Sequence, residues 1–325
     1  MRNCLRRKDI STDFLLLTQN NKQGEYNKIM KGFFKGSATA LITPFNETGV
    51  NYEVLGQLIE HQIAGGTDAI IFLGTTGEPS TMSFAEEHIL MEYAVKKVNK
   101  RTKVIFGCGS NNTADAIMTA QKAESYGADG LLAVTPYYNK CTQNGLVAYY
   151  KAICESVSIP VIAYNVPGRT GVEIQPATMA KIAEIPNIAG IKDAGGNMSK
   201  TMETLRLVRE KCDVYSGEDA LNLPILAAGG VGVISVLSNI VPDKVKELCN
   251  LIEAGDLKSA IALNDKLLPL ANACFVEVNP IPVKEAMNLL GFEAGVPRAP
   301  LTEIEPQNRE KLVIAMKNFG LGVKA

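Results

Sequence analysis

The sequence lacks several features that mark specialised classes of protein. Its 325 residues include no tryptophan and two histidines, His61 and His88, neither in the H-E-x-x-H spacing of a helical zinc site. The seven cysteines are scattered without a C-x-x-C pair, so neither a disulfide framework nor a thiolate metal site is expected. No apolar run reaches the roughly 18 residues that a membrane span requires. These absences favour a protein of a reducing cytoplasm without a structural metal.

The sequence also lacks an excess of charge of either sign. Lysine and arginine total 33 and aspartate and glutamate 34, which gives a net charge of −1. Proteins that bind nucleic acid or membrane surfaces usually carry a basic excess, so neither partner is expected here. The apolar share of 46% and the charged share of 21% are ordinary for a globular chain.

The first thirty or so residues differ from the rest of the chain. A basic flank precedes the apolar stretch Phe14–Leu17, which is shorter than the roughly 7–15 residues of a signal-peptide core. We expect residues 1–33 to form a mobile extension, residues 34–254 a catalytic domain and residues 255–325 a C-terminal helical region.

Short apolar segments then alternate regularly with segments of helical periodicity. The pattern predicts eight strands, each followed by a helix: Ala38–Pro44, Ala69–Gly74, Val104–Gly109, Gly130–Thr135, Val161–Asn165, Ile188–Lys192, Val214–Gly217 and Gly232–Val236. Continuous apolar strands are typical of a parallel sheet covered by helices, and eight such units fit a closed (β/α)8 TIM barrel, an α/β fold. A doubly wound open sheet is the alternative, because periodicity does not show closure. The tail predicts four further helices, over Val245–Ala254, Leu257–Cys274, Pro282–Leu290 and Gln307–Phe319.

Barrel enzymes place their chemistry at the carboxyl ends of the strands, and three of these ends carry polar motifs. The sequence G-T-T-G-E at 74–78 offers two hydroxyls that could orient a carboxylate or pass a proton, although a tight turn with helix-capping threonines fits equally well. The sequence T-P-Y-Y-N at 135–139 could serve packing alone. The sequence Y-N-V-P-G-R-T-G at 164–171 combines a proton donor, Tyr164, with a carboxylate clamp, Arg169, although an exposed arginine is more often simply solvated.

The sixth strand provides the most informative residue. Lys192 ends the otherwise apolar segment Ile188–Lys192 and shares a face with Gly190 and Ile188. In a barrel interior, desolvation lowers the pKa of an amine and makes it nucleophilic. Such a lysine is suited to forming a Schiff base with a carbonyl substrate. The alternative is a strand-end lysine that reaches solvent.

These motifs occur in the order in which the dihydrodipicolinate synthase family carries them, together with G-I-K at 190–192, G-V-I-S-V at 232–236 and N-P-I-P-V-K at 279–284. From Phe34 to the C-terminus the chain resembles this family of pyruvate-dependent class I aldolases. The resemblance implies that Lys192 bonds pyruvate and that Tyr164 shuttles protons, linked through Thr75 to a Tyr138 that the neighbouring subunit provides. It further implies that the substrates are held by Thr76, Ile234, Gly217 and Arg169, with Arg169 at the carboxylate of aspartate semialdehyde.

The implied reaction condenses pyruvate with L-aspartate 4-semialdehyde to 4-hydroxy-tetrahydrodipicolinate, for lysine and diaminopimelate synthesis. No metal or organic cofactor is implied, because the iminium itself accepts electrons. The resemblance also implies a homotetramer of two tight dimers. A sister aldolase such as N-acetylneuraminate lyase would share Lys192 and Tyr164, and a non-catalytic metabolite-binding barrel is the more distant alternative.

The resemblance also bears on feedback by lysine. Tyr137 and Asn111 match the lysine-binding positions of regulated relatives, and Asp115 stands where a glutamate is usual. Phe84 and Glu87 replace histidines, and Pro79 replaces a small residue, which removes hydrogen-bonding capacity and a backbone donor. We therefore expect weak inhibition by lysine or none, although Glu87 could attract the ammonium of the ligand.

Overall fold

Eight parallel strands close into a barrel in the computed structural model, which describes residues 30–324. The strands are paired in the order β1-β10-β9-β8-β7-β6-β5-β4, so each lies beside its neighbour in the chain and the last returns to the first. Their bounds are β1 (Gly36–Ala40), β4 (Ala69–Phe72), β5 (Lys103–Gly107), β6 (Gly130–Val134), β7 (Val161–Asn165), β8 (Ile188–Asp193), β9 (Asp213–Ser216) and β10 (Gly232–Ser235). The predicted eight strands and the (β/α)8 TIM barrel are confirmed, and the open sheet is excluded.

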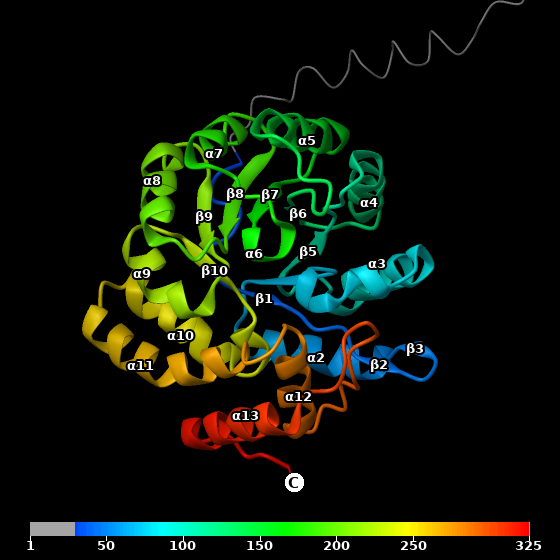
Figure 1. Ribbon diagram of the computed structural model, residues 1–325, viewed down its shortest axis with the longest axis vertical. Coiled ribbons are helices and arrows are strands. Elements are labelled where there is room, and N and C mark those ends of the chain that lie inside the picture. The colour runs from blue at the N-terminus through cyan, green and yellow to red at the C-terminus, as the bar shows by residue number, and fades with distance from the viewer. Residues whose placement is uncertain (1–29, 325) are drawn as a thin grey trace, which may run out of the picture.

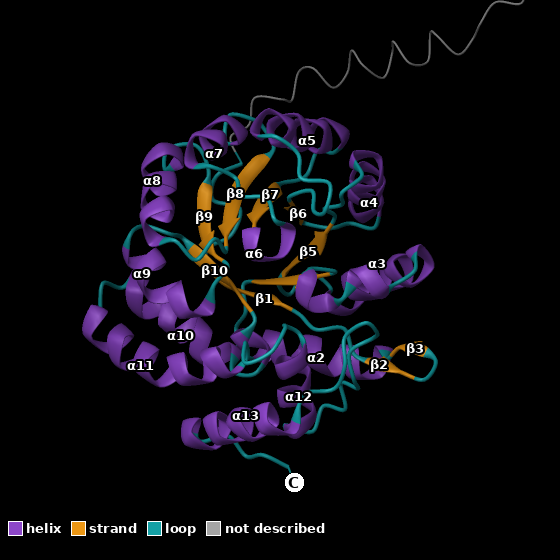
Figure 2. Cartoon of the chain, viewed as in Figure 1, coloured by secondary structure: helices purple, strands orange, loops and turns teal. Residues whose placement is uncertain are grey.

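A ring of helices covers the outside of the barrel (Figure 2). Each barrel strand is followed by one of these helices, namely α2 (Tyr52–Ala64), α3 (Phe84–Val98), α4 (Thr113–Ser125), α5 (Gln143–Ser156), α7 (Pro176–Ile182), α8 (Met198–Val208), α9 (Asn222–Ala227) and α10 (Pro242–Glu253). Side chains of β4 show why both faces of a strand are apolar: Ile71 joins the cluster inside the barrel, whereas Ile70 packs in the layer under the helices. The continuous apolar runs of the sequence therefore reflect burial on both faces.

The amino ends of the strands are closed by the start of the described chain. The Phe34 ring stacks on Tyr215 with centroids 4.2 Å apart, and the Tyr215 hydroxyl donates to the Phe34 carbonyl at 2.9 Å. The Gly32 amide donates to Asp213 Oδ2 at 2.7 Å, so residues 32–33 of the expected extension contact the barrel. Residues 1–29 of the predicted mobile extension lie outside the described residues. Since this end is plugged, the carboxyl ends of the strands are left to form a site.

Two short elements were missed by the sequence pattern. Strand β1 ends at Ala40, before the predicted Pro44, and the chain then forms a hairpin of β2 (Phe45–Asn46) and β3 (Gly49–Val50) that was not predicted. The ladder ends before the predicted Pro44 because the Ile42 amide donates to Asn239 Oδ1 at 3.1 Å and proline has no amide to donate; the Phe45 amide then donates to the Ala294 carbonyl in the tail at 3.1 Å. A four-residue helix, α6 (Pro167–Thr170), follows β7.

The tail packs as helices α11 (Leu257–Ala273), α12 (Ile281–Leu289) and α13 (Pro306–Phe319). Figure 1 shows these helices grouped on one side of the barrel, beside α10 and α2. Contacts of α11 with α10, α9 and α13 join the tail to the barrel in one core. None of the helices in residues 30–324 combines the length and apolar character of a membrane span.

Candidate active site

Lys192 lies near the carboxyl end of β8 and is 4% exposed. It is paired in register with Tyr164 on β7 and with Tyr215 on β9. Its Nζ lies 4.1 Å from the centroid of the Tyr164 ring. The solvent-reaching alternative for this lysine is therefore excluded, and the amine is held against the side chain that was predicted to move protons.

Two glycines provide the space that Lys192 and its neighbours occupy. A Cβ at Gly217 would lie 2.9 Å from both Cγ and Cε of Lys192 and 3.0 Å from the Ala194 Cβ, closer than packed carbon atoms approach. A Cβ at Gly190 would lie 2.6 Å from the Tyr215 ring. Gly217 thus forms the wall beside the lysine because only glycine leaves room for the lysine stem there.

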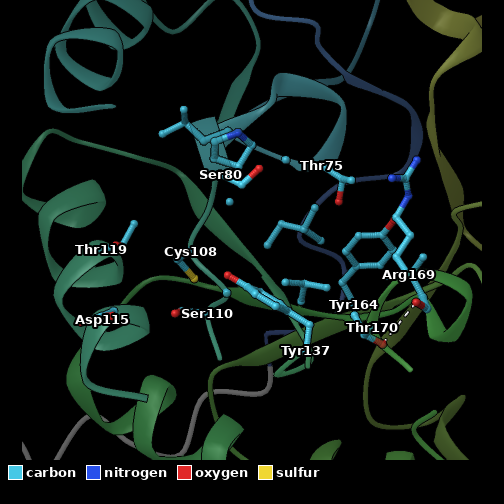
Figure 3. Close-up of a pocket in the computed structure, with 18 of the residues that line it drawn as sticks. Thr75, Ser80, Cys108, Ser110, Asp115, Thr119, Tyr137, Tyr164, Arg169 and Thr170 are labelled. Carbon is cyan, nitrogen blue, oxygen red and sulfur yellow. Dashed lines mark hydrogen bonds between the residues drawn. The ribbon is translucent and has the colours of Figure 1, made fainter. Parts of the chain in front are cut away.

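A cavity of about 420 Å³, large enough for a small metabolite, opens at the carboxyl ends of the strands. Thr75, Tyr164 and Arg169 line it, and Figure 3 shows them on one side of the pocket, with Asp115 and Thr119 across from them. The described residues show no hydrogen bond between Thr75 and Tyr164. Tyr164 both lines the cavity and packs on Lys192, whereas Lys192 itself is not among the lining residues.

Thr76 and Arg169 are connected through a residue of the tail. The Asn279 Nδ2 donates to Thr76 Oγ1 at 2.9 Å, and the Arg169 Nη2 donates to the Asn279 carbonyl at 2.8 Å. Thr76 is 3% exposed, so its hydroxyl is buried at the end of β4. The structure thus brings Thr75, Thr76, Tyr164, Arg169, Lys192 and Gly217 to the same end of the barrel.

The last two predicted positions differ in burial. Ile234 on β10 is 1% exposed and belongs to the cluster inside the barrel that includes Tyr164. Tyr138 is 90% exposed and does not line the cavity of its own chain. Its backbone φ of 70° lies in the left-handed region, which is uncommon for a residue with a side chain. A single chain therefore does not place Tyr138 against Tyr164 or Thr75.

Glu218, on the loop after β9, lies close enough to Lys192 to feel its charge. Burial raises the pKa of Glu218, the neighbouring Asp219 raises it further, and Lys192 opposes both effects. Asp219 itself accepts from the amides of Val236 and Leu237 at 2.9 and 2.8 Å and so anchors the loop after β10. No sequence motif distinguished Glu218, because its effect depends on spatial proximity to a lysine from another strand.

The thiol that lines the same cavity is not a candidate nucleophile. Burial raises the pKa of Cys108 to about 12, so its thiolate is scarce near neutral pH. The cysteines of residues 30–324 are free thiols, as the scattered spacing predicted.

The residues expected at a lysine-binding position gather in the other part of the cavity. Pro79, Phe84, Glu87, Asp115 and Tyr137 all line it. Burial raises the pKa of Glu87 to about 7, and the adjacent Glu86 adds to the effect. Asn111 stands outside the lining, and its carbonyl accepts from the Asn139 Nδ2 at 2.9 Å.

Comparison with known proteins shows which family the chain belongs to. The chain matches the Dihydrodipicolinate synthetase family over residues 33–319. It is 50% identical over 292 residues to a 4-hydroxy-tetrahydrodipicolinate synthase from Caldicellulosiruptor bescii, with 90% of this chain and 99% of the relative covered.

Two crystal structures superpose closely. One is a dihydrodipicolinate synthase from Aquifex aeolicus, with a TM-score of 0.88, 45% identity and coverage of 90% of this chain and 100% of that chain. The other is a dihydrodipicolinate synthase from Acinetobacter baumannii in complex with pyruvate, with a TM-score of 0.86, 43% identity and coverage of 88% and 99%. The chain belongs to the dihydrodipicolinate synthetase family.

Proposed function

We propose that this chain is a lyase that condenses pyruvate with L-aspartate 4-semialdehyde to 4-hydroxy-tetrahydrodipicolinate, in lysine and diaminopimelate biosynthesis. The observation that carries the proposal is the buried Lys192 amine against the Tyr164 ring, beside a cavity lined by Thr75 and Arg169. A relative half identical over nearly its whole length bears the name of this synthase, which favours it over N-acetylneuraminate lyase or a non-catalytic barrel.

The first half of the reaction is assigned to Lys192. Its Nζ attacks the ketone carbon of pyruvate, and loss of water gives the imine. Removal of a proton from the pyruvate methyl group then gives an enamine, with the iminium nitrogen accepting the electron pair. Tyr164 is the proposed proton carrier, and its ring centroid lies 4.1 Å from the Lys192 Nζ. Thr76, the Gly217 wall and Ile234 hold the pyruvate carboxylate and methyl group.

The second half joins the substrates. The enamine carbon attacks the aldehyde carbon of aspartate semialdehyde, and Arg169 binds the carboxylate of that substrate. The substrate amine then attacks the imine carbon, which closes the ring and expels the Lys192 amine. Protons pass through Tyr164 and Thr75, and Tyr138 of a neighbouring subunit completes the relay.

The assembly proposed is a homotetramer of two tight dimers, working in the cytoplasm. The exposed Tyr138 supports it, because a tyrosine that is 90% exposed in one chain is available to a second chain. The substrates are the small molecules named above, and neither nucleic acid nor membrane is a proposed partner.

Trapping with borohydride tests the chemistry directly. Pyruvate and borohydride together are expected to add one reduced pyruvate to Lys192, located by peptide mass spectrometry. A label on another residue would refute the assignment of Lys192. Measuring turnover of aspartate semialdehyde against cleavage of N-acetylneuraminate separates the synthase from the sister lyase.

Feedback by lysine is proposed to be weak or absent. Phe84 and Pro79 offer the ligand no hydrogen-bonding side chain or amide, although both line the cavity. Inhibition by sub-millimolar lysine at saturating pyruvate would contradict this interpretation.

A further inference from the structure

Asn279 joins two residues that the proposed function places on different substrates. It lies in the tail just before α12, and through its side chain and its carbonyl it contacts Thr76 after β4 and Arg169 after β7. Thr76 and Arg169 belong to different strand ends, and the described residues show no hydrogen bond between them. Asn279 is therefore the physical link between the proposed pyruvate and semialdehyde positions.

The direction of the hydrogen bond to Thr76 matters for the ligand. A threonine hydroxyl has a single hydrogen to donate. Because Asn279 Nδ2 donates to Thr76 Oγ1, the hydroxyl hydrogen of Thr76 stays available for another acceptor. A carboxylate oxygen of pyruvate is such an acceptor, and it has no hydrogen to return.

Stability gives little reason for an asparagine at this position. Asn279 is 4% exposed, and its Oδ1 has no hydrogen-bond partner among the described residues. A buried amide with an unpaired oxygen carries a desolvation penalty that an apolar side chain would avoid. Asn288 on α12 provides a contrast, because its amide both donates to and accepts from the backbone of Gly295.

We propose that Asn279 is a positioning residue of the active site. Its side chain directs the Thr76 hydroxyl hydrogen toward the pyruvate carboxylate, and its backbone carbonyl holds Arg169 at the carboxylate of the second substrate. This inference rests on the proposed function and adds to it a residue of the tail that touches neither reacting carbon.

Asn279→Asp tests the inference with almost no change of shape. The new carboxylate accepts the Thr76 hydroxyl hydrogen and places a negative charge near the pyruvate carboxylate. The KM for pyruvate is expected to rise by about tenfold or more, as when a buried polar group loses its partner. The KM for aspartate semialdehyde is expected to stay within about twofold of wild type, because the backbone contact with Arg169 is retained.

Three further measurements separate positioning from a loss of stability. Asn279→Ala is expected to raise the KM for pyruvate in the wild type but not in a Thr76→Val background, because the side chain acts through Thr76. Asn288→Ala breaks two bonds of the tail and is expected to lower the Tm while both KM values stay unchanged. Borohydride trapping on Lys192 at saturating pyruvate is expected to survive in Asn279→Asp, so a failure of the proposed chemistry would appear separately, as a wild-type enzyme without the adduct.

The inference is overturned if Asn279→Asp leaves the KM for pyruvate within about twofold of wild type. It is also overturned if both KM values rise together with a fall in Tm, as a merely structural residue would produce. Should Asn279→Asp fail to fold, the double-mutant cycle with Asn279→Ala decides, since additive effects would exclude action through Thr76.

Discussion

At the scale of single residues, the space around Lys192 decides whether the amine can react. Gly217→Ala is expected to lower kcat/KM about a hundredfold or more, because misplacing a reacting group by about 1 Å has that effect. The added Cβ would meet the middle of the lysine stem, at Cγ and Cε, both at 2.9 Å, so the amine must shift. Steady-state kinetics and borohydride trapping measure the loss.

Gly322→Ala is the matched control for that variant. A Cβ at Gly322 meets no atom within 4 Å, so activity and Tm are expected to equal those of wild type. Full activity of Gly217→Ala would show that Lys192 does not depend on this wall.

Glu87 should make the free energy of unfolding depend on pH. Burial raises the pKa of Glu87 from 4.5 to about 7, so the folded chain holds this proton more tightly than the unfolded chain does. The free energy of unfolding should therefore fall as the pH rises between these two values, and Glu87 should be destabilising above them. Glu87→Gln mimics the protonated form and is expected to raise the Tm at pH 8 while leaving it nearly unchanged at pH 4.5.

Thermal unfolding at the two pH values checks this effect. Glu92→Gln on the same helix is the control, because the Glu92 side chain is half exposed and its pair with Lys96 is a surface pair worth little. An equal rise in Tm at both pH values for Glu87→Gln would attribute the gain to packing instead of ionisation.

At the scale of elements, the tail secures the loop that carries Thr75 and Thr76. Lys284 on α12 pairs with Glu78 at 2.8 Å, with the two side chains 0% and 2% exposed. Glu78 also accepts from the Arg298 amide at 2.9 Å, and its own φ of 57° is left-handed. The loop after β4 thus ends at a strained residue that the tail holds through two contacts.

Breaking that ion pair should be costly. Lys284→Met removes the cation that is hydrogen-bonded to the buried Glu78 carboxylate and is expected to destabilise the chain by about 3–5 kcal/mol. The double variant Glu78→Gln, Lys284→Met is expected to recover a large part of this loss, because no buried charge remains. Denaturant unfolding of the two single variants and the double variant measures the coupling, and additive losses would contradict a direct pair.

Local sequence patterns predict some of these elements and miss others. The eight barrel strands were predictable because both faces of each strand are buried, which leaves continuous apolar runs such as Ala69–Phe72. The hairpin of β2 and β3 was not, because it is stabilised by a contact between Phe45 and Ala294 that no local pattern reveals. The contacts of Asn279 were not predicted for the same reason, since its partners lie 110 and 203 positions away in the chain.

At the scale of the whole molecule, one chain presents an incomplete proposed relay. Lys192, Tyr164 and Thr75 lie at one end of the barrel, while Tyr138 is 90% exposed and outside the cavity of its own chain. If Tyr138 acts in a neighbouring subunit, residues of two chains make one site. Two inactive variants can then restore activity when their chains are mixed in one dimer. Two variants of a site that lies within one chain cannot do so.

Mixing two inactive variants tests this division. Lys192→Ala lacks the proposed nucleophile and Tyr138→Phe lacks the proposed relay hydroxyl, so each homo-oligomer is expected to be nearly inactive. In a mixed dimer, the site with Lys192 from the Tyr138→Phe chain receives an intact Tyr138 from the Lys192→Ala chain, whereas the other site lacks both groups. Random reassortment makes about half of the dimers mixed, and one of the two sites in each mixed dimer is active. Co-refolding should therefore restore about a quarter of wild-type activity. Refolding each variant alone is the control. No recovery, with mixed dimers demonstrated by mass, would place the action of Tyr138 within its own chain and remove the chemical reason for the assembly.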